Sequence, residues 1–296
     1  MDNIRLLHVG LGKCGSGYLE QIFKEITKKR NIELLDIYKF IDKKKIQSHY
    51  LENENNLENK FPKNYILSKR SLFSKRWEFN HLEISFEHLK RNFSNDTTIL
   101  LVLRNPYDLL NSIYIQAIQV YEIKKPSEFF YVEKNDIQRK NGMFNLYNFD
   151  YKFLISLYKS YFKNVIVVKY EDLNNLDFLY KIFDYDESFL ESLQKYKDIH
   201  YNRSISSVGV STIMFLAKFF DLKKYQRFIK RKITNTKNPI YKIKNRILRQ
   251  FLLREFFQEK FDKIFPYKKF YIYKKFIPID IDKINKEYND LDVTKL

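Results

Sequence analysis

An uninterrupted run of β-branched and aliphatic residues, TTILLVL at positions 97–103, constrains the fold of this chain more than any other segment. A strand with one solvated face alternates apolar and polar residues, whereas a run without alternation is typical of a parallel strand covered on both faces. A second run of this kind, VIVVK, occupies positions 165–169. The first run predicts a central parallel strand of an α/β fold, and the second predicts another buried strand.

Shorter strand patterns and helical patterns alternate with these runs. Leu19, Ile22, Phe23 and Ile26 recur at spacings of three and four residues, which predicts one buried helical face after the first strand. The alternation predicts a three-layer α/β fold with a parallel central sheet and helices on both faces, similar to the P-loop nucleotide-binding proteins. The other predicted strands are 5–10, 32–40 with its loop, and 64–68. The first predicted helix ends near residue 28, and an exposed loop is predicted at 52–60. The remaining predicted helices are 42–51, 86–93, 106–121 and 145–162.

Positive charge is concentrated in the last third of the chain. Residues 201–296 hold 23 of the 54 Lys and Arg residues but only 9 of the 36 Asp and Glu residues, and 222–254 holds 12 basic residues and no acidic one. We predict a core of residues 1–205 and a basic, mainly helical extension of residues 206–296 packed on it. Such a charge balance indicates an anionic partner: a nucleotide, an acidic glycan, an anionic membrane surface or a nucleic acid.

The N-terminal residues lack the basic region and long apolar core of a signal peptide. No window approaches the roughly 18 to 20 apolar residues of a spanning helix. The single cysteine, Cys14, excludes an internal disulfide framework and a Cys-rich metal site, and no other metal-ligand cluster is apparent. We therefore expect a cytoplasmic protein, soluble or peripheral to the inner face of the membrane.

A glycine-rich segment, Gly10-Leu11-Gly12-Lys13-Cys14-Gly15-Ser16-Gly17, separates the first strand from the first helix. Glycines allow a sharp turn with exposed N–H groups, the helix N-terminus favours negative charge, and a lysine adds a full positive charge. The Ser16 hydroxyl is placed either to cap the helix or to bind an anion oxygen. The segment is not a Walker A loop, and the dinucleotide reading has only Asp36 as a ribose-binding acid.

A second polar segment, Arg104-Asn105-Pro106-Tyr107-Asp108, follows the 97–103 strand, and Ser112 lies eight residues after Arg104. Open α/β sheets bind ligands at the carboxyl ends of their strands. A guanidinium fork beside a hydroxyl suits a phosphomonoester. The alternative is an arginine that caps its own turn through Asp108.

Together the segments resemble the PAPS-dependent sulfotransferase family, where PAPS is 3'-phosphoadenosine-5'-phosphosulfate. HVGLGKCGSGYL (8–19) is similar to the family's 5'-phosphosulfate loop, and LVLRNPYDLLNSIY (101–114) to its 3'-phosphate motif. VIVVKYEDL (165–173) and HYNRSIS (200–206) resemble two later segments, in the expected order. This sequence departs from the family pattern at Gly12, Gly17 and Leu109.

The resemblance implies a role for each matching residue. Lys13 would bind the sulfonate or bridging oxygen and offset charge on the leaving phosphate. Arg104 and Ser112 would hold the 3'-phosphate. The remaining donor-binding residues would be Gly12, Cys14, Gly15, Ser16, Gly17 and Arg203. The scheme requires no metal, and its product is PAP.

The general base is predicted less directly. Asp36 is the first candidate because in glycan-modifying relatives a glutamate commonly follows the second strand about twenty residues after the loop lysine. Asp36 lies 23 residues after Lys13, with Leu35-Asp36 where those relatives have Lys-Glu. His81 is the alternative, since it lies 23 residues before Arg104, a spacing like that of the cytosolic branch's histidine. Glu33 and His49 rank lower.

The function predicted from these residues is sulfuryl transfer from PAPS to a hydroxyl or amine, with a glycan or glycolipid as the acceptor. We expect acceptor contacts in 52–63 and 122–142. Peripheral contact of the basic extension with an anionic membrane is a further expectation, whereas no motif indicates specific nucleic-acid binding. Two alternatives remain: a P-loop phosphotransferase, and a non-catalytic basic protein that binds membrane or RNA.

Overall fold

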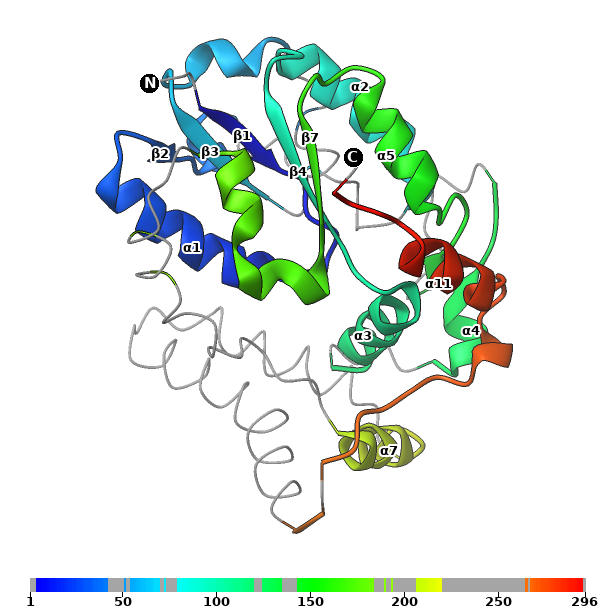
Figure 1. Ribbon diagram of the computed structural model, residues 1–296. Helices are drawn as coiled ribbons and strands as arrows, with labels where there is room; N and C mark the ends of the chain where they lie inside the picture. The colour runs from blue at the N-terminus through cyan, green and yellow to red at the C-terminus, as the bar shows by residue number, and fades with distance from the viewer. Residues whose placement is uncertain are drawn as a thin grey trace, which may run out of the picture.

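The computed structural model describes residues 4–41, 51, 54–69, 72, 79–119, 124–134, 143–183, 189, 193, 206–219, 264–265 and 267–294. Within these ranges a single parallel sheet forms the centre of the molecule (Figure 1). Its strands, in spatial order, are β2 (Glu33–Leu34), β3 (Tyr65–Ser68), β1 (Arg5–His8), β4 (Thr98–Leu103) and β7 (Val165–Lys169). All four pairings are parallel.

The two apolar runs occupy adjacent places in this sheet. β4 lies between β1 and β7, with Leu7 opposite Ile99 on one side and Val167 opposite Leu101 on the other. Every residue of β4 after Thr98 is buried. Because both faces of the strand are covered, no position favours a polar residue, which explains the missing alternation. The predicted parallel α/β fold is confirmed.

Helices cover both faces of the sheet (Figure 1). α1 (Ser16–Lys29) packs on one face through its buried residues, which include Leu19, Ile22, Phe23 and Ile26, as its periodicity predicted. On the other face α2 (Leu82–Asn92) and α5 (Tyr151–Lys159) lie together (Figure 1). α3 (Pro106–Gln119) continues directly from the carboxyl end of β4.

The predicted helix 145–162 begins six residues late. Residues Phe144–Asn145 form β6, which pairs with β5 (Phe130–Tyr131). The Asn145 side chain donates to the Glu133 carbonyl at 2.8 Å and accepts from the Glu133 N–H at 3.2 Å. The helix starts after Asp150, whose carboxylate accepts from the N–H groups of Lys152 and Phe153. Asparagine bonding to backbone competes with helix, and an aspartate cap fixes the true start.

Two other predicted boundaries also change. The second strand is only Glu33–Leu34, and a 3₁₀ turn, η1 (Ile37–Lys39), follows it. Part of the predicted 52–60 loop is a 3₁₀ turn, η3 (Leu57–Lys60), in which Leu57 is fully buried. The Glu58 carboxylate accepts from Tyr65 and from Thr97, so this segment is held against the sheet. The predicted helix at 42–51 lies outside the described residues except for Leu51.

The C-terminal residues that the structure describes pack beside α3. α7 (Ser207–Leu216) is joined to the later segment by a hydrogen bond from the Ser207 N–H to the Lys268 carbonyl at 2.7 Å. α11 (Ile281–Asn289) lies next to α3 (Figure 1). The basic segment 222–254 lies outside the described residues. The remaining short elements are η6 (Phe79–His81), α4 (Pro126–Phe129), η7 (Tyr170–Asn175), η8 (Asp177–Lys181) and η10 (Lys274–Phe276). In the part of the chain described, no helix combines the length and apolar character needed to cross a membrane.

Candidate functional site

The two polar segments meet where the strand order reverses. The chain passes from β1 outward to β2 and β3, and then returns to β4 on the other side of β1. Such a switch point leaves a crevice at the carboxyl ends of the two central strands. The loop after β1 and Arg104 after β4 both lie there, because each directly follows one of these strands.

The glycine loop turns through two residues with left-handed backbone. Lys13 has φ 71° and Gly15 has φ 75°. A Cβ atom on Gly15 would lie 2.6 Å from Leu173 Cδ1 and 3.3 Å from Tyr170 Cε2, so the loop approaches η7 closely. A Cβ on Gly10 would lie 2.9 Å from His8 Nε2. The glycines are therefore needed both for backbone angle and for space.

The N-terminus of α1 is open to an anion. Among the described residues no side chain caps it, and its first turn carries no acid. The first intrahelical bond runs from the Leu19 N–H to the Gly15 carbonyl, so the preceding N–H groups of the helix have no intrahelical acceptor. The Cys14 N–H, by contrast, donates to the Leu11 carbonyl at 3.3 Å and is used within the turn.

Two buried polar atoms at this site lack a hydrogen-bond partner within the described residues. They are Ser16 Oγ, in a residue 7% exposed, and Arg104 Nε. Burying a polar atom without a partner is costly, and such atoms are rare in folded proteins. The Ser16 hydroxyl does not cap its own helix. The Ser16 hydroxyl and the Arg104 Nε–H can both donate to the phosphate oxygens of a nucleotide.

Arg104 contacts the glycine loop directly. Its Nη1 donates to the Lys13 carbonyl at 2.9 Å, and its guanidinium carbon lies 4.6 Å from the centre of the Tyr170 ring. The Tyr151 hydroxyl donates to the Arg104 carbonyl at 2.7 Å. The alternative of an arginine that caps its own turn through Asp108 is not seen, because the Asp108 carboxylate forms an ion pair with Lys269.

Ser112 lies in the second turn of α3 and is half-buried. The start of this helix is fixed from several sides. The Asn105 side chain accepts from the Asp108 N–H at 3.2 Å, and Asn285 Oδ1 accepts from the Tyr107 N–H at 3.1 Å. The position of Ser112 relative to Arg104 therefore depends on a well-anchored helix start. Its predicted contact with the 3'-phosphate stays a prediction.

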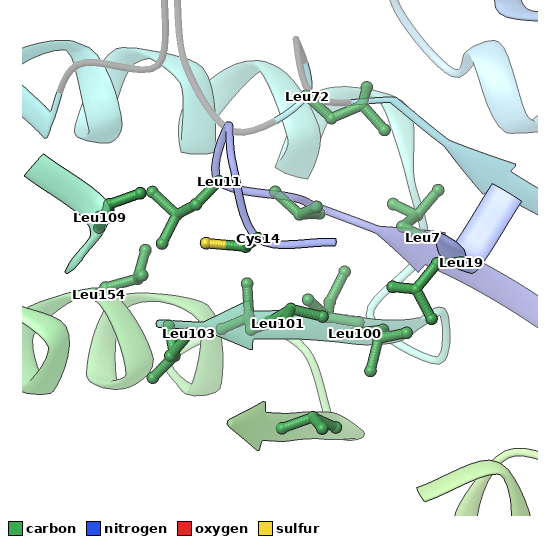
Figure 2. Close-up of a cluster of buried hydrophobic side chains, with 14 of the residues drawn as sticks. Leu7, Leu11, Cys14, Leu19, Leu72, Leu100, Leu101, Leu103, Leu109 and Leu154 are labelled. Carbon is green, nitrogen blue, oxygen red and sulfur yellow. The ribbon is translucent and has the colours of Figure 1, made fainter. Parts of the chain in front are cut away.

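Cys14 is a packing residue in this structure. Figure 2 shows its sulfur among leucine side chains of the loop, β4 and α5, and the residue is fully buried. The thiol points to the Gly12 carbonyl at 3.9 Å. Burial raises the pKa of the Cys14 thiol to about 12. A thiol that is protonated at neutral pH is a poor nucleophile, which favours the packing role.

The two candidates for the general base lie in different settings. Asp36 follows β2, and its carboxylate, 51% exposed, pairs with the Lys69 ammonium at 3.8 Å. Lys69 follows the neighbouring strand β3, so the pair lies at the carboxyl edge of the sheet. His81 ends η6 and is 8% exposed, and its carbonyl accepts from the Ser85 hydroxyl at 2.9 Å. The exposed Asp36 is the better placed of the two to meet an acceptor from solvent.

The other predicted site residues, Glu33, His49 and Arg203, have no described contact with the glycine loop or Arg104. Glu33 is an exposed residue of β2. His49 and Arg203 lie outside the described residues, as does most of the HYNRSIS segment.

The aromatic residues that contact Arg104 were not among the predicted site residues. Tyr170 belongs to the YEDL part of the 165–173 segment. Among the described side chains none caps η7; instead Glu171 accepts a hydrogen bond from the Tyr288 hydroxyl. The Tyr151 and Tyr288 rings lie 5.8 Å apart. The position of Tyr170 directly after a buried strand was the one local signal that placed it at the site edge.

The fold and this site define an α/β protein with a nucleotide-type anion site at its switch point. The family model described as a sulfotransferase domain matches residues 4–178, which include β1 to β7 and both polar segments. The chain therefore belongs to the PAPS-dependent sulfotransferase family, as its motifs predicted, and it is an enzyme of sulfuryl transfer that uses PAPS.

Two further comparisons accompany this match. A search of curated proteins returned no match. A crystal structure of mouse sulfotransferase SULT7A1 complexed with PAP is similar at 12% sequence identity, covering 85% of this chain and 89% of that chain, with a TM-score of 0.34. The family assignment rests on the family model.

Proposed function

We propose that this chain moves the sulfuryl group of PAPS to a hydroxyl of a carbohydrate, and that the crevice between β1 and β4 holds the nucleotide. The observation that carries the proposal is the hydrogen bond from Arg104 Nη1 to the Lys13 carbonyl. It joins the loop that resembles a 5'-phosphosulfate site to the arginine that resembles a 3'-phosphate site. One nucleotide with phosphates at both ends suits this arrangement.

Each residue of the loop has a proposed task. Bound PAPS would supply an activated sulfuryl group on a phosphate leaving group. The N–H groups at the start of α1 and the Ser16 hydroxyl would bind the 5'-phosphate. The Lys13 ammonium would neutralise charge that develops on the leaving phosphate. Gly12, Gly15 and Gly17 would let the backbone approach the nucleotide, while Cys14 packs beneath it.

Arg104 and Ser112 would bind the 3'-phosphate, and Arg203 would contribute from its own segment. The unpartnered Nε of Arg104 supports this assignment, because it leaves a guanidinium N–H for the ligand. Two positive charges at the crevice, on Lys13 and Arg104, favour a nucleotide with an additional phosphate group.

Asp36 is proposed as the general base. Its carboxylate is at the carboxyl edge and half-exposed, where an incoming hydroxyl would arrive from solvent. The Lys69 ammonium lies 3.8 Å from this carboxylate. An exposed ion pair suits a polar acceptor such as a carbohydrate better than a flat apolar one, which supports the proposed acceptor class.

Thermal unfolding with candidate ligands tests the donor site. PAP is expected to raise the midpoint more than ATP with Mg²⁺ or NAD, since a ligand at 100 times its Kd adds about 2.7 kcal/mol of stability. Arg104→Ala should abolish the PAP shift, while the control Arg91→Ala, an exposed arginine of α2, should keep it. A larger shift with ATP and Mg²⁺ would refute the proposal and support a phosphotransferase.

Transfer of radiolabelled sulfate from PAPS to a panel of acceptors tests the acceptor class. We expect label on oligosaccharides or glycolipids, and little on simple phenols or alkyl amines. Label confined to phenols would contradict the carbohydrate assignment without affecting the donor site.

The proposed location is the cytoplasm, at the inner face of an anionic membrane. What supports it is the basic segment of the sequence at 222–254 and the exposed aromatic side chains of Phe215 and Phe219, which are 58% and 67% exposed. Co-sedimentation with vesicles tests it. We expect binding to vesicles that contain anionic lipid but not to zwitterionic vesicles. No binding to either kind, or equal binding to both, would refute the proposed location.

A further inference from the structure

The Arg104 side chain is arranged before any ligand arrives. The Lys13 carbonyl accepts from its Nη1, and the Tyr170 ring lies against its guanidinium, 4.6 Å from ring centre to carbon. The backbone of Arg104 is held as well, because the Tyr151 hydroxyl donates to its carbonyl. Arginine has many rotamers, so groups that fix it reduce the entropy lost when a ligand binds.

The Tyr170 ring is partly exposed, and its neighbour in sequence is bonded to a buried residue. Tyr170 is 36% exposed, so packing covers only part of the ring. The next residue, Glu171, accepts a hydrogen bond from the Tyr288 hydroxyl. Tyr288 is 4% exposed, so this bond connects the surface turn after β7 to the interior.

Tyr288 belongs to α11, which is bonded both to α3 and to the end of β7. Midway along α11 the Asn285 side chain accepts from the Tyr107 N–H in the first turn of α3. At the C-terminal end of α11 the Lys169 ammonium donates to the Asn289 carbonyl at 3.3 Å and lies 5.2 Å from the centre of the Tyr288 ring. Figure 1 shows α11 beside α3. The helix thus joins the element after Arg104 to the end of β7.

We propose that Tyr288 is a positioning residue of the nucleotide site: through its hydrogen bond to Glu171 it fixes the turn that holds the Tyr170 ring against Arg104. The inference rests on the proposed function, since it concerns how well the site binds the donor. Tyr288 acts through Glu171 and Tyr170. Burial, followed by the bond to Glu171, raises the pKa of Tyr288, so the phenol keeps its proton and donates across the working pH range.

Tyr288→Phe tests the proposal with a minimal change. The ring that packs on Tyr151 stays, and only the hydroxyl that donates to Glu171 is lost. We expect the Kd for PAP, measured by calorimetry, and the KM for PAPS to rise about three- to tenfold, the net effect of one hydrogen bond. The kcat should stay within about twofold of the wild-type value, because no group at the reacting atoms is removed.

Partner and control variants separate positioning from a general structural effect. Glu171→Gln keeps an oxygen that accepts from Tyr288 and should bind PAP like the wild type, whereas Glu171→Ala should weaken binding as Tyr288→Phe does. The double variant Tyr288→Phe/Glu171→Ala should be no weaker than either single variant. Tyr273→Phe, a 73% exposed tyrosine near α11, is the matched control and should leave the Kd unchanged.

The possible results divide clearly. Failure of the wild type to bind PAP overturns the proposed function, and this inference with it. Wild-type binding together with an unchanged Kd for Tyr288→Phe overturns this inference alone. Equal and additive losses from Tyr288→Phe and Glu171→Ala would also overturn it, because they would show that the two residues act separately.

Discussion

Gly15→Ala offers a direct test of the loop geometry. Gly15 has φ 75°, and a Cβ there would lie 2.6 Å from Leu173 Cδ1, well inside van der Waals contact. Leu173 is 2% exposed and has little room to move. Gly17 is the matched control: it lies in the first turn of α1, and a Cβ there would meet no described atom within 4 Å.

The expected cost has two parts. A non-glycine residue in left-handed backbone costs about 1 to 2 kcal/mol. Forcing a methyl group against a packed side chain costs about 1 to 3 kcal/mol. Because the neighbours relax in part, we expect Gly15→Ala to lower the free energy of unfolding by about 2 to 4 kcal/mol in total. Gly17→Ala should instead be neutral or gain up to about 1 kcal/mol, since alanine favours the helix.

Urea unfolding of the two variants and the wild type measures these differences. A double-mutant cycle with Leu173→Ala separates the two parts, because removing the leucine relieves the contact but not the backbone strain. We expect a coupling of about 1 to 2 kcal/mol between Gly15→Ala and Leu173→Ala. Equal stability of Gly15→Ala and Gly17→Ala would refute the described loop conformation.

Three further predictions concern single side chains. Arg104→Lys keeps the charge but loses the planar fork that reaches Lys13 and Tyr170, so calorimetry should show PAP binding weakened about 10- to 100-fold. The Cys14 thiol ionises near its ordinary pKa of 9.0 in the unfolded chain but near about 12 in the fold, so its contribution is complete below pH 9 and is lost as the pH rises toward 12. Between about pH 8 and about pH 10, the unfolding free energy of the wild type should fall about 1.4 kcal/mol more than that of Cys14→Ala. Asp36→Asn should lower kcat about 100-fold or more with the Kd for PAP unchanged; a normal kcat would exclude Asp36 as the base.

The two longest strands of the sheet, β4 and β7, were predictable from sequence because they are largely buried. Burial of β4 and β7 imposes continuous apolar runs, and no helix or loop needs such a pattern. The second strand was predicted only together with its loop, over 32–40, because Leu35 and Ile37 after the strand are buried and apolar like strand residues. The start of α5 was misplaced because Phe144 and Asn145, before Asp150, form a strand of a small two-stranded sheet rather than part of a helix.

Of the candidate site, the loop and its arginine were predictable as a pair. Which buried polar atoms would lack a hydrogen-bond partner, Ser16 Oγ and Arg104 Nε, could not be predicted. Whether the Ser16 hydroxyl caps α1 or faces a ligand depends on a rotamer, and both alternatives use the same residue at the same position. In the structure the hydroxyl is buried and accepts no backbone N–H among the described residues, so it does not cap α1.

Distance along the chain explains why one long-range contact was foreseeable and another was not. Arg104 and Lys13 are 91 residues apart, yet each follows one of two adjacent parallel strands, so strand order alone brings them together. Glu171 and Tyr288 are 117 residues apart, and Tyr288 belongs to α11, whose position is not set by strand order. Its place is set by side-chain contacts such as that of Asn285 with the start of α3. Contacts of this kind leave no periodic pattern in the sequence. The proposed influence of α11 on the nucleotide site therefore had no counterpart among the motifs of the sequence.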